Sequence, residues 1–337
     1  MDRDSNFSKK LIVKYRKEHY NLTEFIDKHP GGVIKGLRNA DITARFSKAH
    51  PHSEAATYLM NEYKIYGKTQ THGRNEGKKK VDFSKSPQEI NNQFSEDMEY
   101  LVDWSKAMLP QIANITKYYN DWVHKPVDRP LLLFDSWYLE MFTKTPWWLV
   151  PTFWIPVIAN LLWIDFEKNS DSKFEIAYFF GNVFVGIFFW TLLEYALHRW
   201  IFHIKISCDS SAWLCTFHFL IHGLHHKVPF DPMRLVFPPL PGVILVNIIY
   251  FPISYVIPRP RVILVGALIG YLSYDMIHYY LHYGNPKAKH LYNMKRYHYQ
   301  HHFVHQNLGY GISSTLWDVV FKTCINLRKL TYRLNWT

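Results

Sequence analysis

The sequence predicts a mainly α-helical protein, in which a small α+β unit precedes a multi-pass membrane core. We expect four transmembrane helices and a cytosolic, histidine-rich cap. Three observations predict this class. The first 68 residues are polar, four uncharged runs lie between residues 146 and 274, and ten histidines stand in four short clusters near the ends of these runs. A metal site at one membrane surface is therefore expected.

Composition divides the chain into three parts. Residues 1–68 form the N-terminal unit, and residues 69–100 are charged and poor in large apolar groups, which is typical of a linker. Residues 101–337 carry the apolar runs and the histidine clusters, so we expect one membrane-embedded domain there. Its first part, residues 101–144, mixes tryptophan with basic residues in a helical pattern. This pattern fits a helix on the membrane surface and equally one packed on a soluble domain.

Four runs without charge are candidates for transmembrane helices. A spanning helix needs about 20 apolar residues. Three runs meet that length, and the fourth meets it only with its histidine-rich end included. A large soluble helical core is the alternative, but the tryptophan and phenylalanine of these runs favour the membrane. The runs are residues 146–164, 176–193, 235–258 and 262–274.

The charges beside these runs predict the orientation. Four spans place both termini on one side of the membrane, and that side also carries a strongly basic tail. The positive-inside rule therefore predicts cytosolic termini. All four histidine clusters fall on the same side. The basic residues of the opposite loops are Lys168, Lys173, Arg259 and Arg261.

Overall composition fits a membrane protein. The net charge is +11, which suits nucleic acid or an anionic membrane surface, and aromatic residues make up 17% of the chain. No basic helix with interleaved aromatics is visible, so we expect a membrane and no nucleic acid as partner. Three cysteines without a CxxC pair exclude a disulfide framework and a thiolate zinc site. The polar N-terminus predicts no cleavable signal peptide.

The histidine clusters have spacings that suit metal coordination. Helical residues at i, i+3 and i+4 share a face, so three clusters present their imidazoles on one side. His198 and His203 are five apart, and we expect the helix to end or distort between them. Ten imidazoles offer two metal ions about five ligands each, although imidazole alone does not distinguish iron, copper and zinc. The candidate metal ligands are His198, His203, His222, His225, His226, His278, His282, His298, His301 and His302.

A purely structural role for these histidines is disfavoured, because each buried imidazole would need its own hydrogen-bond partner. The region has neither HExxH nor Glu-x-x-His, which leaves a histidine-dominated dinuclear site beside lipid. Such a site favours chemistry on an acyl chain or a sterol. Three further residues are candidates for supporting roles beside the ligands. His218 and His305 share helical faces with the clusters, and Asp275, one turn before His278, is a candidate acceptor for an imidazole N–H.

The series HxxxxH, HxxHH, HxxxH and HxxHH resembles that of the fatty acid hydroxylase/sterol desaturase superfamily, and its clusters match the ten histidines position by position. The resemblance implies a centre of two iron ions that activates O2 and attacks an unactivated C–H bond. Zinc stands above iron(II) in the affinity order of divalent metals, so zinc is a competing occupant in a purified sample.

The N-terminal unit resembles cytochrome b5. The stretch YNLTEFIDKHPGG, residues 20–32, resembles its haem-binding turn, with His29 as one axial ligand. The HSEAA stretch makes His52 a better match for the second ligand than His50. The resemblance implies bound haem b. The segment before Tyr20 is short, and we expect it to lack the strand and helix that usually lead such a domain.

A cytochrome b5 domain fused to this core resembles the fatty acid 2-hydroxylases over essentially the whole chain, including DWVHKPVDRP at residues 121–130. The resemblance implies an O2-dependent monooxygenase of the endoplasmic reticulum membrane that hydroxylates C2 of long-chain acyl groups for sphingolipids. It also implies a long-chain acyl lipid or ceramide as substrate, with an NAD(P)H-dependent cytochrome b5 reductase or related flavoprotein as electron source. A sterol desaturase or sterol methyl oxidase, and a haem- and metal-binding protein without turnover, are the alternatives.

The expected depth of the metals also bears on the carbon that reacts. The clusters lie at the ends of spans, so the site lies at the level of the lipid headgroups. Burying an unpaired carbonyl or amide costs about 2–7 kcal/mol, which keeps the polar end of an acyl lipid near water. The chain then extends into an apolar groove between spans, and C2 lies nearest the metals.

Overall fold

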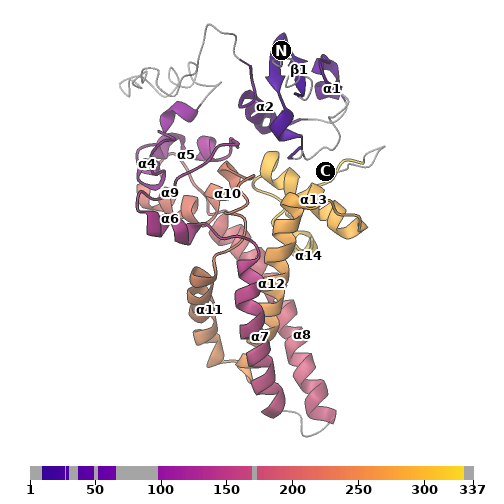
Figure 1. Cartoon of the computed structure of the whole chain (residues 1–337). Helices are drawn as coiled ribbons and strands as arrows, with labels where there is room; N and C mark the ends of the chain where they lie inside the picture. The colour runs from indigo at the N-terminus through magenta and orange to yellow at the C-terminus, as the bar shows by residue number, and fades with distance from the viewer. Residues whose placement is uncertain are drawn as a thin grey trace, which may run out of the picture.

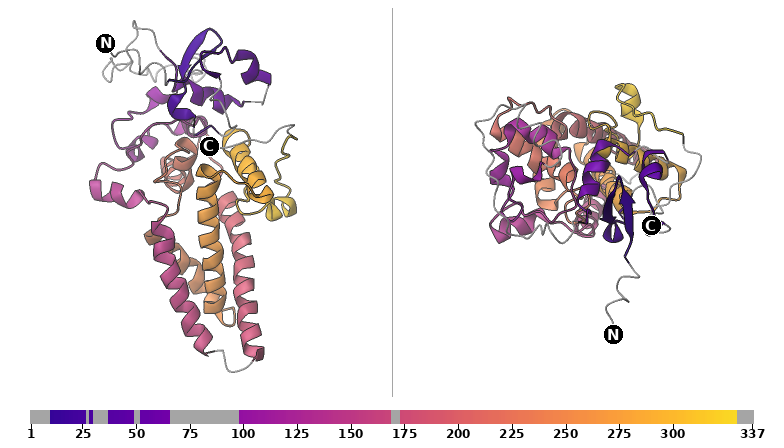
Figure 2. Two further views of the ribbon diagram at one scale, coloured as in Figure 1. Left: turned by 45° about the vertical axis from the view of Figure 1, so that its right-hand side comes forward. Right: turned by 90° about the horizontal axis from the view of Figure 1, so that it is seen from above.

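The computed structural model describes residues 10–26, 28–29, 37–48, 52–65, 98–168 and 173–329. Long helices run side by side, and the N-terminal unit lies beyond one end of them (Figure 1). The other views place the short helices and the C-terminal helices at this same end (Figure 2). The described part is mainly helical, as predicted, with a single two-stranded sheet.

The N-terminal unit begins with a hairpin of β1 (Ile12–Tyr15) and β2 (Glu18–Asn21). Arg16 and Lys17 both have positive φ angles, 47° and 74°, as a two-residue hairpin turn requires. The expectation that no strand precedes Tyr20 was therefore wrong, because this turn pairs Tyr20 with Val13 in the hairpin. The hairpin packs with η2 (Thr23–Phe25), α1 (Thr43–Lys48) and α2 (Glu54–Asn61) around a small apolar core.

Among the residues that the structure describes, three helices are long and apolar enough to cross a membrane. They are α7 (Leu149–Lys168), α8 (Lys173–Ala196) and α12 (Pro260–Tyr283), the last of which contains the fourth predicted run. The third predicted run, residues 235–258, forms a shorter helix than expected, because α11 (Pro239–Ser254) covers only 16 residues. Prolines limit it at its first residue and near its end, at Pro252, and prolines cannot donate to a helical hydrogen bond.

Helices α8 and α12 approach each other closely at two glycines. A Cβ atom on Gly186 would lie 2.1 Å from the carbonyl oxygen of Ile263, and one on Gly266 would lie 2.0 Å from that of Val183. Small residues allow membrane helices to bring their backbones together in this way. This crossing fixes the relative position of two helices that lead to histidine clusters, because α8 continues into η5 with His198 and α12 carries His278 and His282.

Residues 98–143 form short helices and not one surface helix. These are η4 (Glu99–Leu101), α4 (Leu109–Ile112), α5 (Thr116–Val123) and α6 (Trp137–Thr143). Helix α5 buries Tyr119 and Trp122 against Phe219. Helix α6 instead exposes its apolar side chains, with Trp137 74% exposed. The membrane-surface position predicted for residues 101–144 therefore suits α6, whereas α5 packs within the protein.

The remaining elements gather at the end of the bundle nearest the N-terminal unit (Figure 1). Two π-helical turns, η5 and η6, each continue from an α-helix. The elements are η5 (Leu197–Phe202), α9 (Ala212–His218), η6 (Phe219–Gly223), α10 (Leu224–Lys227), α13 (Lys289–Phe303) and α14 (Leu316–Val320).

Candidate metal centre

The structure brings the ten candidate histidines together from four segments. Nine fall into two groups, within each of which the ligand atoms lie within 4.8 Å of one another. His226 joins the smaller group, because its Nε2 atom lies 3.0 Å from that of His222. The larger group is His225, His278, His282, His298 and His302, and the smaller is His198, His203, His222 and His301.

A π-helical turn brings the rings of His198 and His203 together, although the two residues are five positions apart. The backbone N–H of His203 donates to the carbonyl of His198 at 2.9 Å, which is the i to i+5 bond of a π turn. The two ring centroids are 4.9 Å apart. The predicted distortion between these residues is confirmed. A second π turn, η6, carries His222.

Nε2 atoms in each group face one another, as the ligand atoms of a shared cation do. His301 Nδ1 lies 2.8 Å from the carbonyl oxygen of Leu308. His198 Nδ1 lies 2.6 Å from that of Tyr310. A ring nitrogen that faces a carbonyl carries the proton, so both Nε2 atoms have lone pairs. His301 Nε2 is 3.0 Å from Nε2 of His203. Neighbouring nitrogens bound to one ion at about 2 Å stand about 3 Å apart, so the donor set fits a metal.

The surroundings keep these imidazoles neutral. Burial lowers the pKa of His225, His298 and His302 well below the ordinary value of 6.5, and neighbouring imidazoles lower it further. A neutral imidazole has the lone pair that a metal needs. The groups are therefore in the form that binds a cation.

Two buried carboxylates hold the loop that orients His198 and His301, and the sequence analysis did not find them. Glu194 accepts from the backbone N–H groups of Ile312 and Ser313, both at 2.9 Å. Asp318 accepts from the N–H of Tyr310 at 3.0 Å. The available signal was an acidic residue within an apolar run, one turn before His198. These carboxylates position the carbonyls that fix the two imidazole rings.

The three residues predicted to support the ligands have different positions. Asp275 accepts from the backbone N–H of Phe237 at 3.1 and 3.2 Å, so it holds the loop before α11 and not an imidazole. The imidazole N–H that was predicted to bind Asp275 has another partner, because His278 hydrogen-bonds the backbone of Leu235. His218 is buried, with Nδ1 2.6 Å from the Tyr119 hydroxyl, and packs under η6. His305 is exposed after α13.

An apolar cavity of about 370 Å³ opens from the centre into the helical bundle. Three of the candidate ligands, His222, His225 and His278, line one end of it. From there it extends between α8, α11 and α12, past residues such as Leu245 and Ile249. Its walls suit a hydrocarbon chain whose end reaches the histidines.

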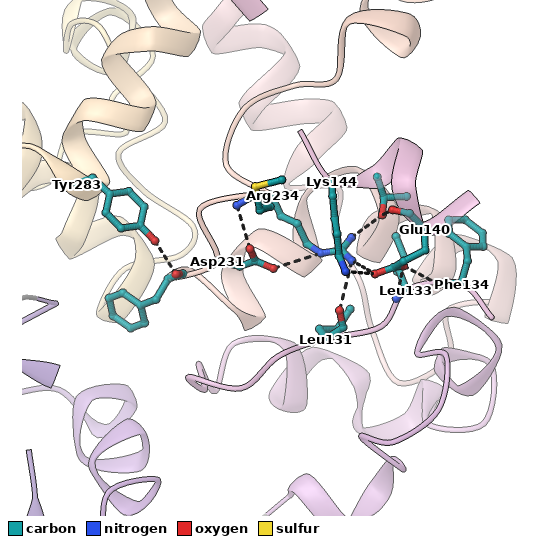
Figure 3. A network of polar contacts seen from close by, with 11 residues as sticks. Leu131, Leu133, Phe134, Glu140, Lys144, Asp231, Arg234 and Tyr283 are labelled. Carbon is teal, nitrogen blue, oxygen red and sulfur yellow. Dashed lines mark hydrogen bonds and ion pairs between the residues drawn. The ribbon is translucent and has the colours of Figure 1, made fainter. Parts of the chain in front are cut away.

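A network of ion pairs closes the side of this cavity toward α6 (Figure 3). Arg234 donates to Glu140 Oε1 at 2.5 Å and to the Thr143 hydroxyl at 2.8 Å. Glu140 Oε2 accepts from the N–H groups of Leu133 and Phe134. Burial tends to raise the pKa of Glu140, but the Phe134 N–H and the Arg234 guanidinium outweigh it and lower the pKa below 4.5. The network is therefore charged at neutral pH.

The N-terminal unit brings the rings of His29 and His52 close together. Their ring centroids are 6.1 Å apart, and the Nδ1 of His52 lies 2.8 Å from the carbonyl oxygen of Phe46. The Nε2 of His52 is then free of that proton. Two metal–nitrogen bonds of about 2 Å, plus half a ring at each end, come to about 6 Å, so the pair fits one iron between the rings. His50 lies outside the described residues.

The fold and the two sites define the class of protein, a membrane protein with a histidine-bound metal centre and a cytochrome b5-like domain. Residues 183–323 match the fatty acid hydroxylase family, and residues 3–69 match the cytochrome b5-like heme/steroid binding domain. A solved structure described as full length scs7p, with only its hydroxylase domain visible, is 32% identical, with a TM-score of 0.61. The match covers 73% of this chain and 91% of the chain in the solved structure.

Curated relatives match most of the chain. A fatty acid 2-hydroxylase of Macaca fascicularis is 36% identical over 91% of this chain and 89% of its own length. A ceramide very long chain fatty acid hydroxylase of Saccharomyces cerevisiae is 30% identical over 97% of both chains. A dihydroceramide fatty acyl 2-hydroxylase of Arabidopsis thaliana is 42% identical over 66% of this chain and 93% of its own. The chain belongs to the fatty acid 2-hydroxylase family.

Proposed function

We propose that this protein is an O2-dependent membrane monooxygenase that adds a hydroxyl group to C2 of long-chain fatty acyl groups for sphingolipids. The observation that carries the proposal is the apolar cavity that ends at His222, His225 and His278. The names of the relatives support an acyl or ceramide substrate. A sterol desaturase or sterol methyl oxidase is less favoured, because the cytochrome b5-like domain is fused to the chain and the relatives are named as fatty acyl hydroxylases.

The ten histidines would hold two iron ions, and His29 and His52 would hold haem b as axial ligands. When bound, the iron pair supplies O2 activation and attack on a C–H bond. The reaction consumes one O2, two electrons and two protons, and it forms one C–OH group and one water. An NAD(P)H-dependent flavoprotein reductase would supply the electrons through the haem domain.

The chain's own residues account for the choice of carbon. The cavity holds the tail away from water, while the acyl carbonyl stays at the polar end near the histidines, where its oxygen finds partners. The methylene next to the carbonyl then lies nearest the centre. This register depends on the carbonyl and not on the methyl end, so C2 is selected for tails of different lengths.

We also propose four membrane crossings, an endoplasmic reticulum location and a cytosolic centre. Helix α11, with the residues that follow it, would make the fourth crossing although it is short. Two ion pairs support this, because Arg259 contacts Glu175 and Arg261 contacts Asp165, each at 3.0 Å. They join the α11–α12 turn to the C-terminal end of α7 and the N-terminal end of α8, so these helix ends and this turn lie together, far from the histidines. The domain boundaries at residues 68 and 100 remain predictions.

The test is lipid analysis of cells that lack their own 2-hydroxylase and express this chain under 18O2. The expected product is a 2-hydroxy acyl group with one 18O atom, detected by mass spectrometry in ceramides. The His301→Ala variant should give none, whereas His19→Ala, with its side chain at an exposed position on β2, should match the parent. A sterol product, or a hydroxyl at mid-chain, would contradict the proposal.

A further inference from the structure

Ion pairs join the N-terminal unit to the stretch DWVHKPVDRP. Arg129 donates from Nε and from Nη2 to the two carboxylate oxygens of Glu62, at 2.5 and 2.7 Å. Asp128 Oδ2 accepts from Lys28 and from the Tyr63 hydroxyl, both at 2.5 Å. A two-pronged arginine–carboxylate pair fixes orientation as well as distance. Two neighbouring residues of this stretch therefore hold η2 and α2 in one pose.

A second polar contact connects α2 to the segment that carries the histidines. The Tyr58 hydroxyl donates to Glu99 Oε1 at 2.6 Å. The same oxygen accepts from Lys227 at 2.7 Å, and Lys227 is fully buried and follows His226. Lys227 also donates to the carbonyl of Trp122. The carboxylate of Glu99 therefore links Tyr58 of α2 to Lys227 of α10.

An apolar contact fills the space between these polar contacts. Phe25 meets Phe230 edge-to-face, with ring centroids 5.9 Å apart and planes at 90°. Phe230 is buried, and its carbonyl accepts from the Tyr283 hydroxyl at 2.6 Å, which holds it in place (Figure 3). Leu59 of α2 and Phe303 of α13 belong to the same cluster. Aromatic pairs of this geometry add stability beyond their buried area.

These contacts complete a chain of aromatic rings between the two candidate sites. His29 lies 5.8 Å from Phe25, and Phe25 lies 5.9 Å from Phe230, centroid to centroid. Phe230 lies 6.2 Å from Phe303, which lies 6.2 Å from His302. Each ring is in contact range of the next. The chain therefore begins at a candidate haem ligand and ends at a candidate metal ligand.

We propose that Asp128 and Arg129 dock the haem domain so that electrons pass along Phe25, Phe230 and Phe303 to the histidine centre. The inference rests on the proposed function for its two cofactors. In each transfer the haem is oxidised by one electron and the centre is reduced by one, and two transfers serve one turnover. Electron tunnelling weakens steeply with distance, so a fixed pose with bridging rings favours it. Tethering also raises the effective concentration of the donor.

Carbodiimide coupling in the purified full-length holoenzyme tests the docked pose directly. This reagent joins an amine to a carboxylate only where they touch, and Lys28 and Asp128 are partly exposed, 33% and 17%. We expect an amide between them within one chain, identified as a linked peptide by mass spectrometry. Reversing Arg129 to Glu should lower its yield about tenfold, the factor for loss of roughly 1.4 kcal/mol. The double variant Glu62→Arg/Arg129→Glu should restore it.

The matched control is Lys14→Glu, because Lys14 pairs with Asp41 inside the haem domain. Its yield should equal that of the parent. Absence of the Lys28–Asp128 amide from the parent, or equal yields in the Arg129→Glu variant, would overturn the docked pose. The coupling needs neither iron nor substrate, so its result is independent of enzymatic activity.

Flash reduction of the haem tests the route. In oxidised, iron-loaded enzyme without O2, the absorbance of reduced haem should decay as the electron moves to the centre. Replacing Phe25 or Phe230 by Leu should remove most of the fast decay while leaving the Lys28–Asp128 amide intact. Phe217→Leu is the control, because Phe217 stacks on Trp213 away from the chain of rings. Zinc-loaded enzyme should show no decay.

Fast decay in both the Phe25→Leu and the Phe230→Leu variants would overturn the route. If Phe230→Leu folds poorly, the Phe25→Leu variant alone decides the test. The two proposals fail separately. A parent enzyme with normal decay but no 2-hydroxylated lipid would refute the proposed reaction and leave the electron route standing. Formation of 2-hydroxylated lipid together with unaltered haem decay in the ring variants would refute the electron route and leave the proposed reaction standing.

Discussion

The Nε2 atoms of His301 and His203 lie 3.0 Å apart, although the two residues are 98 positions apart in the sequence. His203 ends a π turn after α8, and His301 lies on α13. The Nδ1–H of His301 donates to the carbonyl of Leu308, so the lone pair of His301 Nε2 points at His203. This pair shows how the fold converts separate clusters into one donor set.

Removing His301 should therefore empty the metal centre without affecting haem. The His301→Ala variant should lose most of the iron that the histidine centre of the purified parent contains. The variant lacks one ligand, while the Nε2 lone pairs of the neighbouring histidines still point at one another. Elemental analysis measures the iron, and the Soret absorbance measures haem. His226→Ala should behave in the same way. Parent protein that is active with well under two metal ions per chain would refute the dinuclear centre.

Haem should depend on His29 and His52 and not on His50. The variants His29→Ala and His52→Ala should lose the Soret band, since each removes one of two rings whose centroids lie 6.1 Å apart. His50→Ala should retain the band. Non-haem iron, which is total iron from elemental analysis minus the haem iron, should be unchanged in all three. A dispensable His52 with an essential His50 would show that the assignment of the second ligand is wrong.

Filling the cavity should change the accepted chain length and not the site of hydroxylation. Ala267 lines the cavity on α12, so Ala267→Phe shortens the space for the tail. We expect a shift toward shorter acyl products, all still hydroxylated at C2, in mass spectra of products from two substrate lengths. Ile248→Phe, on the exposed face of α11, is the control. Hydroxylation that moves with the methyl end would contradict the carbonyl-based register.

The Glu140–Arg234 pair should make part of the stability depend on pH. The pKa of Glu140 is lowered in the folded protein, so its contribution is complete above the ordinary value of 4.5 and is lost as the pH falls through the folded-state pKa. Glu140→Gln removes one of the two carboxylates that pair with the buried guanidinium of Arg234, the other being Asp231 at 3.3 Å, and it should cost about 1.5–3 kcal/mol at neutral pH. Thermal unfolding from pH 7 to values well below the ordinary pKa of 4.5 should show this difference shrinking. A constant difference would exclude the linkage.

The sequence alone determined those features that depend on local spacing. Residues four apart share a helical face, so the ligand faces of HxxxH and HxxHH, and the break between His198 and His203, follow from helix geometry. Long uncharged runs likewise identify α7, α8 and α12, since apolar length governs membrane crossing. The length of α11 was overestimated, because its prolines end the helix inside the apolar run.

Tertiary structure decided the contacts between segments that no spacing relates. The carbonyls of Leu308 and Tyr310 orient two imidazoles, yet a backbone carbonyl has no residue identity to read in a sequence. Asp275 lies one turn from His278 but binds the N–H of Phe237, because the loop before α11 folds onto it. The pairing of two groups of histidines, and the contact of Phe25 with Phe230, likewise depend on packing over long sequence separations, which local patterns do not encode.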